Sequence, residues 1–419
     1  MSSTTTTRVH NRFHRLSYAL LLWAFGLINS VTLAQPAPPP PKPPAQGNPA
    51  PPPPASPFGT PLAGLTGAQI TAWNNGKAEF TEAESVPDGL GPIFNGKSCV
   101  ECHSQPAPGG SSGILVTRFG HTAGSTFDPL TSLGGSLLQE FAINPVGLEH
   151  IPPQANAIAH RQSTPLFGLG LIEAIPDATI LKGVRTTPVN GVLGRAALIV
   201  DNDSPATRVG RFGWKAQHAT LLSFAADAYL NEIGITNRLF PTENAPNGNL
   251  ILLKQLDKVP DPEDSVDKAT GKAGIDRLAD FMRMTSPPPT LPVNASTTFG
   301  AKIFIDVGCA NCHTPMMSTG TSTITAISNK NVWLYSDLLL HDMGSLGDGI
   351  GQGAAGVKEM KTPPLWGLRA SAPYLHDGRA PNIDAAIKAH DGEAATSRGQ
   401  YLKLSADQQE LLAEFLDSI

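Results

Sequence analysis

Apolar residues recur at helical spacing in several stretches of the chain, a pattern typical of helices that bury one face. Residues 297–307 carry apolar side chains at positions 299, 303, 304 and 307, and the stretch ends near Gly308, a common helix terminator. Residues 219–233 have the same amphipathic period. Near the C-terminus, one face collects Leu411, Leu412, Phe415 and Leu416. We expect helices in all three places.

Polar residues mark where two helices begin. Ser405 and Gln408 have the spacing of a capping box, in which each side chain bonds the backbone N–H of the other residue. Thr66 and Gln69 have the same spacing and predict a helix that runs toward Glu79. The pattern therefore favours a mainly α fold.

The first 57 residues are expected to lie outside the fold. A basic start, an apolar run over residues 16–28 and small residues near Ala34 are typical of a signal peptide, here 1–34, and predict a periplasmic or secreted protein. An uncleaved anchor is the alternative, but the run is shorter than the roughly 20 residues of a membrane span. Residues 35–57 are rich in proline and predict an extended linker. No integral span is expected in the mature chain.

Composition narrows the class of protein. The net charge is -5, charged residues make up 16% of the chain, and no long basic run follows the N-terminus, so a nucleic-acid partner is not expected. Glycine and proline number 41 and 39, whereas aromatic residues are 6%. Irregular chain of this kind suits packing around a large planar cofactor.

All four cysteines fall in two C-x-x-C-H units. This spacing predicts covalent attachment of c-type haem: both thiols add to haem vinyl groups, and the histidine becomes the proximal iron ligand. The predicted attachment residues are Cys99 and Cys102 with His103, and Cys309 and Cys312 with His313.

Two other interpretations of the cysteines were weighed. A structural zinc site has no use for a histidine after both pairs. A thioredoxin-like motif would need a strand before and a helix after it, whereas both units here lead into proline-bearing loops. Two haems therefore remain the favoured interpretation.

The flanks of the two units repeat. Phe94 and Phe304 each lie five residues before the first cysteine, which predicts the same short helix before both motifs. The segments 164–169 and 362–368 share a Thr-Pro start and a Gly-Leu end. We therefore expect two cytochrome c-like haem domains, 58–290 and 291–419, the first with a large mixed or irregular insertion that runs roughly from 177 to 285.

The chain resembles the di-haem oxidoreductase family, some members of which carry the label thiol oxidoreductase, a family related to bacterial di-haem cytochrome c peroxidases. That label is chemically at odds with thiols consumed in thioethers. The stretches that carry the resemblance are GLGPIFNGKSCVECH (89–103), TPLFGLGLIEAIPD (164–177), GRFGWKA (210–216), YSDLLLHDMG (335–344), TPPLWGLRASAPYLHDGRA (362–380) and IKAHDGEA (387–394).

The resemblance implies a peroxidase that reduces hydrogen peroxide, with electrons from a small donor protein such as a cytochrome c or a cupredoxin. The resemblance also implies a second axial iron ligand for the C-terminal haem, fourteen residues after the histidine of the HDG segment. That histidine is His376 here, and the position fourteen residues later is His390. A histidine there, where the related peroxidases have methionine, would lower the reduction potential. Met343 is the alternative ligand, and His376 is expected to be structural.

The other face of the N-terminal haem stays open at this point. An acid is needed to carry a proton between the peroxide oxygens, and Glu173, a lone acid in an apolar run, is the candidate; pairing with an arginine such as Arg161 is the alternative. Trp214 and Trp366 could lie between the haems or simply pack. Calcium is possible between the domains, although no compact acidic loop marks a site.

The candidate ligands for the other face of the N-terminal haem are His121, His150, His160 and His218, besides an open position.

Three functions fit these features. An enzyme that reduces peroxide is favoured, because a pure electron carrier with two six-coordinate haems needs far less chain. A haem oxidase acting on an organic substrate is the third.

Overall fold

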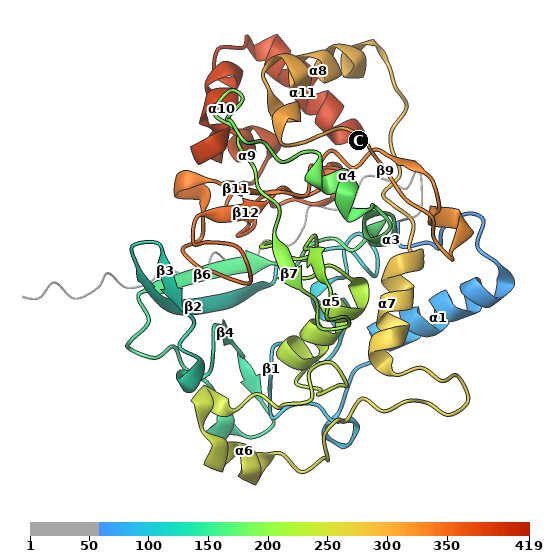
Figure 1. The fold of residues 1–419 in the computed structure, drawn as a ribbon, viewed down its shortest axis with the longest axis vertical. Helices are drawn as coiled ribbons and strands as arrows, with labels where there is room; N and C mark the ends of the chain where they lie inside the picture. Colours follow the sequence, from blue (N-terminus) through green and yellow to red (C-terminus); the bar gives the residue numbers. More distant parts are fainter. Residues whose placement is uncertain (1–57) are drawn as a thin grey trace, which may run out of the picture. The chain divides into compact units, whose positions relative to one another are not determined.

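The computed structural model describes residues 58–419 (Figure 1). Helices of all kinds make up 35% and strands 16% of it, so the fold is mixed, and the expectation of a mainly α fold was wrong. The predicted signal peptide and linker lie outside the described residues. The α-helices are α1 Gly67–Thr81, α2 Cys99–Cys102, α3 Leu169–Glu173, α4 Asp177–Leu181, α5 Leu221–Ala228, α6 Leu250–Leu256, α7 Gly274–Met284, α8 Ala295–Asp306, α9 Ile383–Ala389, α10 Ala395–Tyr401 and α11 Ala406–Ser418.

The strands are short and occur mostly as antiparallel pairs. The longest, β2, pairs with β6 from Leu115 opposite Gln162 to Gly120 opposite Ala157, and β3 and β4 also pair with β2. The strands are β1 Ile93–Phe94, β2 Leu115–Ala123, β3 Thr126–Asp128, β4 Leu137–Leu138, β5 Phe141–Ala142, β6 Ala157–Gln162, β7 Leu198–Val200, β8 Thr207–Val209, β9 Met317–Ser318, β10 Asn331–Val332, β11 Leu340–Asp342 and β12 Glu359–Lys361.

The predicted helix starts are confirmed. Thr66 and Gln69 form the capping box of α1, and Ser405 and Gln408 form that of α11. The stretch 297–307 lies largely in α8, and 219–233 forms α5 followed by a π-helical turn, Tyr229–Ile233. In each case the local pattern and the tertiary packing agree.

Helices α1 and α7 cross at a glycine, in contact with each other (Figure 1). A Cβ atom on Gly76 would lie 2.2 Å from the carbonyl oxygen of Arg277, so only glycine permits this approach. One turn further along α1, the ring of Phe80 packs against Phe281, with their centroids 4.8 Å apart. The indole N–H of Trp73 donates to Thr285 at the end of α7.

Helices α8 and α11 cross in the same way. A Cβ atom on Gly300 would lie 2.1 Å from the carbonyl oxygen of Leu411, and the ring of Phe304 packs on Phe415 with centroids 5.5 Å apart. The sequence G-x-x-x-F thus occurs in both entry helices. It makes Phe80, and not Phe94, the counterpart of Phe304.

Two predictions about the flanks of the first motif need correction. Phe94 lies in strand β1, so the expected short helix directly before Cys99 does not exist. Helix α7, which falls inside the predicted insertion, supplies the helix that packs on α1 and therefore belongs to the packing of the first haem unit. The domain boundary at 290 and 291 stays a prediction.

The repeated Thr-Pro segments end in the same way. Each ends at a left-handed glycine, Gly168 and Gly367, both with φ +73°, and each then enters a short helical turn. Added Cβ atoms at these two glycines would meet Pro287 and Pro288 respectively, at 2.9 and 2.7 Å. The two repeats are thus packed against adjacent residues of the same connecting segment.

The crossing at Gly76 generates a stability prediction. We expect Gly76→Ala to lower the free energy of unfolding by about 1–3 kcal/mol, because the added methyl group forces α1 and α7 apart. Gly67→Ala, at the first residue of the same helix with no atom within 4 Å of the new methyl group, should leave stability unchanged or slightly raised. Denaturant unfolding of the intact protein measures both, and equal stability of the two variants would contradict the packing argument.

Candidate haem centres

The second motif forms a tight helical turn that fixes its histidine. The turn Cys309–Asn311 is followed by a hydrogen bond from the His313 backbone N–H to the Cys309 carbonyl, at 2.9 Å. The His313 ring places Nδ1 3.1 Å from the carbonyl oxygen of Tyr335. Because a carbonyl can only accept, Nδ1 carries the proton and Nε2 keeps its lone pair for a metal.

The first motif repeats this geometry. The His103 backbone N–H bonds the Cys99 carbonyl at 3.0 Å, and the His103 Nδ1 lies 3.0 Å from the carbonyl oxygen of Gly110. Burial is the main cause that lowers the pKa of both His103 and His313 to about 4, so both rings are neutral at pH 7. Neutral, buried and oriented imidazoles suit a proximal iron ligand.

Cys99 and Cys309 do not have the features of redox thiols. Burial raises the pKa of Cys99 and Cys309 to about 12, whereas reactive cysteines have a lowered pKa that favours the thiolate. Neither of these two residues forms a disulfide. The geometry therefore favours haem attachment over dithiol chemistry.

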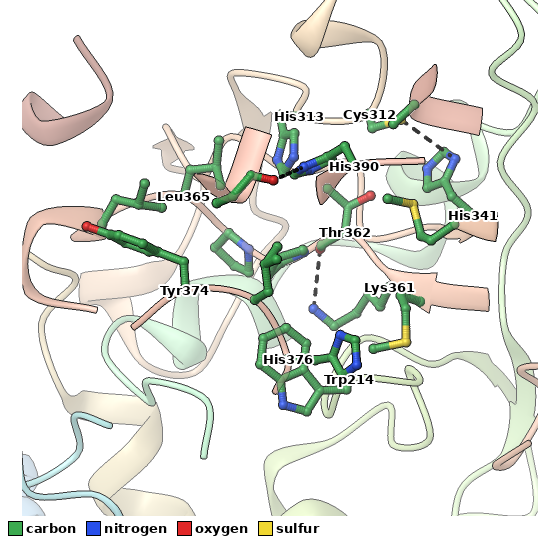
Figure 2. A pocket seen from close by; sticks show the side chains of 18 of the residues that line it. Trp214, Cys312, His313, His341, Lys361, Thr362, Leu365, Tyr374, His376 and His390 are labelled. Carbon is green, nitrogen blue, oxygen red and sulfur yellow. Dashed lines mark hydrogen bonds between the residues drawn. The ribbon is translucent and has the colours of Figure 1, made fainter. Parts of the chain in front are cut away.

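A cavity of about 270 Å³ lies beside the second motif and is lined by Cys309, Cys312 and His313 (Figure 2). We call it the C-terminal cavity. Figure 2 shows His390 next to His313, and their ring centroids are 6.4 Å apart. Metal–nitrogen bonds of about 2 Å on both faces of one ion would place two trans imidazole centroids about 6 Å apart. The spacing thus fits one iron between the two rings.

His390 is oriented as a ligand must be. It ends α9, and its Nδ1 lies 2.8 Å from the carbonyl oxygen of Ala386, which leaves Nε2 as the acceptor nitrogen. Burial lowers its pKa, so the ring is neutral at pH 7. Met343, the alternative ligand, lines the same cavity.

The second Thr-Pro repeat forms a wall of this cavity, from Thr362 to Trp366. His376 is buried in the same wall and packs edge-on against Trp214, with centroids 6.2 Å apart. Trp366 also lies against Gly168 of the first repeat. His376 thus has a packing position beside the cavity.

Another cavity, of about 180 Å³, is lined by Cys99, Cys102 and His103, and we call it the N-terminal cavity. Among residues 58–419, His103 is the only histidine in its lining. The four candidates for its other face lie elsewhere: His121 bonds the Gln154 carbonyl, the His150 side chain is exposed, His160 contacts Thr117 and His218 contacts Ser223 and Asp227. The structure therefore brings none of them to the cavity.

Tyr229 and Met282, which also carry potential ligand atoms, line the N-terminal cavity too. The Tyr229 hydroxyl is engaged by Glu84 at 2.8 Å. Met282 follows Phe281 on α7 in the same way as Leu416 follows Phe415 on α11. Leu416 lines the C-terminal cavity, as Met282 lines the N-terminal one. The repeat makes Met282 an apolar wall residue.

The two candidate acids have different surroundings. Glu173 accepts from Arg283 at 2.6 and 3.0 Å and from the Leu221 backbone N–H, and it lines neither cavity. The arginine partner is thus Arg283, whereas Arg161 pairs with Asp348. The alternative weighed for Glu173, an ion pair with an arginine, describes its place in the structure.

Glu232 lines the N-terminal cavity together with His103, a position that sequence reasoning missed. Its carboxylate accepts from the Asn95 side chain at 2.8 Å, and burial raises its pKa. Its only signal in the sequence is that it is an acid within the apolar stretch 219–233. A buried acid with a raised pKa is what proton transfer requires.

The two cavities share part of their walls. Gln162, Thr164 and Trp214 line both, and the Trp214 indole N–H donates to the Gln162 carbonyl at 2.9 Å. Trp366 lines the C-terminal cavity only. Of the two tryptophans, Trp214 therefore has the position between the cavities.

A buried ion network lies beside the N-terminal cavity. The Asp348 carboxylate lies 2.6 Å from the Arg161 guanidinium and 2.9 Å from the Lys215 ammonium, and all three side chains are at most 5% exposed. Arg161 lines the N-terminal cavity. The two cations lower the pKa of Asp348 despite its burial.

The chain belongs to the di-haem oxidoreductase family. A family model described as "Di-haem oxidoreductase, putative peroxidase" matches residues 154–419, which is more than half of the sequence. The matched region contains the second haem motif and begins after the first. Within residues 58–419, no helix is both long and apolar enough to cross a membrane.

Solved structures give distant matches. Hydrazine synthase of Kuenenia stuttgartiensis matches with a TM-score of 0.41 at 16% identity, over 87% of this chain and 89% of the other. The di-haem peroxidase BthA of Burkholderia thailandensis matches with a TM-score of 0.39 at 11% identity, over 90% and 95%. A MauG-like protein associated with microbial copper homeostasis matches with a TM-score of 0.31 at 16% identity, over 60% and 88%. No curated protein gave a significant sequence match.

The ion network generates the second prediction. We expect Asp348→Asn to destabilise the protein by about 3–5 kcal/mol, because it leaves two buried cations without a counter-charge. Asp306→Asn, which removes an exposed pair with Lys302, should cost less than about 1 kcal/mol. Thermal unfolding compares the two variants, and a small effect of Asp348→Asn would refute the assigned role.

Proposed function

We propose that the protein is an exported di-haem peroxidase that reduces hydrogen peroxide to two waters, consuming two protons and two electrons from a small cytochrome c or cupredoxin. Membership of the di-haem oxidoreductase family supports this proposal. The observation that carries it is the difference between the cavities. The C-terminal cavity holds two facing histidines, whereas the N-terminal one, among residues 58–419, holds one histidine and two acids, Asp227 and Glu232, of which Glu232 has a raised pKa.

The residues present fit two covalently attached haems. Cys99 and Cys102, and Cys309 and Cys312, would hold them, with His103 and His313 as proximal ligands. When bound, haem iron supplies the redox chemistry that cleaves an O–O bond or passes single electrons, according to whether its sixth position is open. The side chains around each cavity determine whether its haem would cleave an O–O bond or pass single electrons.

Because of His390, we assign the C-terminal site to electron transfer. With both His313 and His390 holding the haem, this cavity would leave no ligand position for peroxide. Two histidine ligands favour a lower potential than histidine with methionine. Electrons from the donor protein would enter here, and Trp214, in the wall of both cavities, lies on the route to the other site.

Because of Glu232, we assign the N-terminal site to the reduction of peroxide. A raised pKa allows this carboxyl to take a proton from one peroxide oxygen and return it to the leaving oxygen. The Asn95 amide holds one carboxylate oxygen and so fixes the orientation of the group. Glu173, bound to Arg283, serves instead to tie α3 to α7.

Visible spectra separate this proposal from a pure electron carrier. We expect the oxidised or half-reduced protein to contain high-spin iron that changes on addition of peroxide, cyanide or azide. Spectra with only low-spin iron, unchanged by all three in both redox states, would favour the carrier. An organic substrate oxidised faster than a reduced cytochrome c would favour the oxidase.

Glu232→Gln tests the proton carrier. We expect kcat for peroxide reduction to fall by about 10²–10⁴-fold, because glutamine keeps the shape of the side chain but cannot transfer the proton. The covalent haem content and the spectrum should be unchanged. Glu173→Gln is the matched control and should keep most of the activity; the reverse result would restore Glu173 as the catalytic acid.

His390→Ala tests the C-terminal ligand. We expect one haem to become high-spin while covalent attachment persists, because the cysteines and His313 are untouched. Met343→Ala, in the same cavity, should leave the spectrum as it is. A low-spin His390→Ala protein combined with a high-spin Met343→Ala protein would move the assignment to Met343.

A further inference from the structure

Three acids outside the haem cavities converge at the base of the loop between α6 and α7. Glu243, Asp261 and Glu263 each place one carboxylate oxygen within 4.8 Å of the others. Glu243 is only 8% exposed, whereas Asp261 is exposed and Glu263 is intermediate. The group is therefore closed on one side and open to solvent on the other.

The Glu243 carboxylate lacks a partner for one of its oxygens. Its Oε1 accepts the backbone N–H of Asn244 at 3.0 Å, but Oε2 is buried and has no hydrogen-bond partner among residues 58–419. A buried acceptor left unbonded beside other acids is costly unless a cation lies there.

We propose that Glu243, Asp261 and Glu263 bind one Ca²⁺ ion. Ca²⁺ takes oxygen ligands at about 2.3–2.6 Å, so two ligands on opposite sides of one ion are up to about 5 Å apart, and the cluster falls within that span. All three ligands are hard carboxylates, and the exposed Asp261 gives the ion a way in from solvent. Calcium tolerates irregular geometry from flexible loops, whereas Mg²⁺ requires a near-ideal octahedron.

The ion would fasten this loop to the N-terminal haem unit. The Thr236 backbone N–H donates to Glu263 at 2.6 Å and its hydroxyl to Asp261 at 2.7 Å. The neighbouring Asp264 accepts the backbone N–H of Gly274 at 2.6 Å and so caps the start of α7. The site therefore connects α7 with the segment that follows Glu232, and it does not depend on the proposed peroxidase activity.

Calcium titration of the holoprotein, after treatment with EGTA and desalting, tests the site directly. We expect calorimetry to show one ion bound per chain, Ca²⁺ to raise Tm, and Mg²⁺ at the same concentration to raise it less. Glu243→Gln should abolish the calcium response, because it removes the buried carboxylate ligand. Glu410→Gln, an exposed acid on α11, should behave as the wild type in both conditions.

Asp261→Asn covers the case in which Glu243→Gln does not fold, because residue 261 is exposed. This variant should keep the wild-type haem spectrum and bind Ca²⁺ at least tenfold more weakly. A wild-type protein whose Tm is insensitive to Ca²⁺, or variants at residues 243 and 261 with undiminished calcium binding, would overturn the proposal. Peroxidase activity is not a readout in this experiment, so its outcome is separate from that of the proposed function.

Discussion

Each haem motif depends on one hydrogen bond, from Nδ1 of its histidine to a backbone carbonyl. The acceptor is Gly110 for His103 and Tyr335 for His313, so both lie in the chain that follows the motif. The bond fixes the tautomer and leaves Nε2 free to bind a metal, while burial keeps the ring neutral. A motif alone can only supply the ligand; the loop behind it supplies the orientation.

The surrounding architecture repeats because both cavities need the same support. Two helices that cross at a glycine, and an extended Thr-Pro segment that ends in a left-handed glycine, occur in each half of the described chain. What differs is the side chains that these supports present. His390 faces His313 across the C-terminal cavity, whereas Glu232 and Asn95 lie in the lining of the N-terminal one.

Local signals in the sequence were sufficient where the structure is local. Capping boxes and the 3.6-residue period located α1, α8 and α11. His390 was reached through the family resemblance, and its role as a ligand stays a prediction. Phe80 was missed because the loop 82–98 separates α1 from its motif, whereas α8 leads almost directly into Cys309. Glu232 could not be told from Glu173, since both are acids in apolar runs and only tertiary contacts show that Arg283 holds one of them.

The buried ion network near the shared wall has an electrostatic consequence. Arg161 and Lys215 together carry one more charge than Asp348 neutralises, and burial lowers the pKa of Lys215 to about 8. A net positive charge in a medium of low dielectric constant stabilises an electron placed nearby. Loss of the Lys215 proton above that pH would remove this effect, so the net charge of the buried network depends on the protonation state of one lysine.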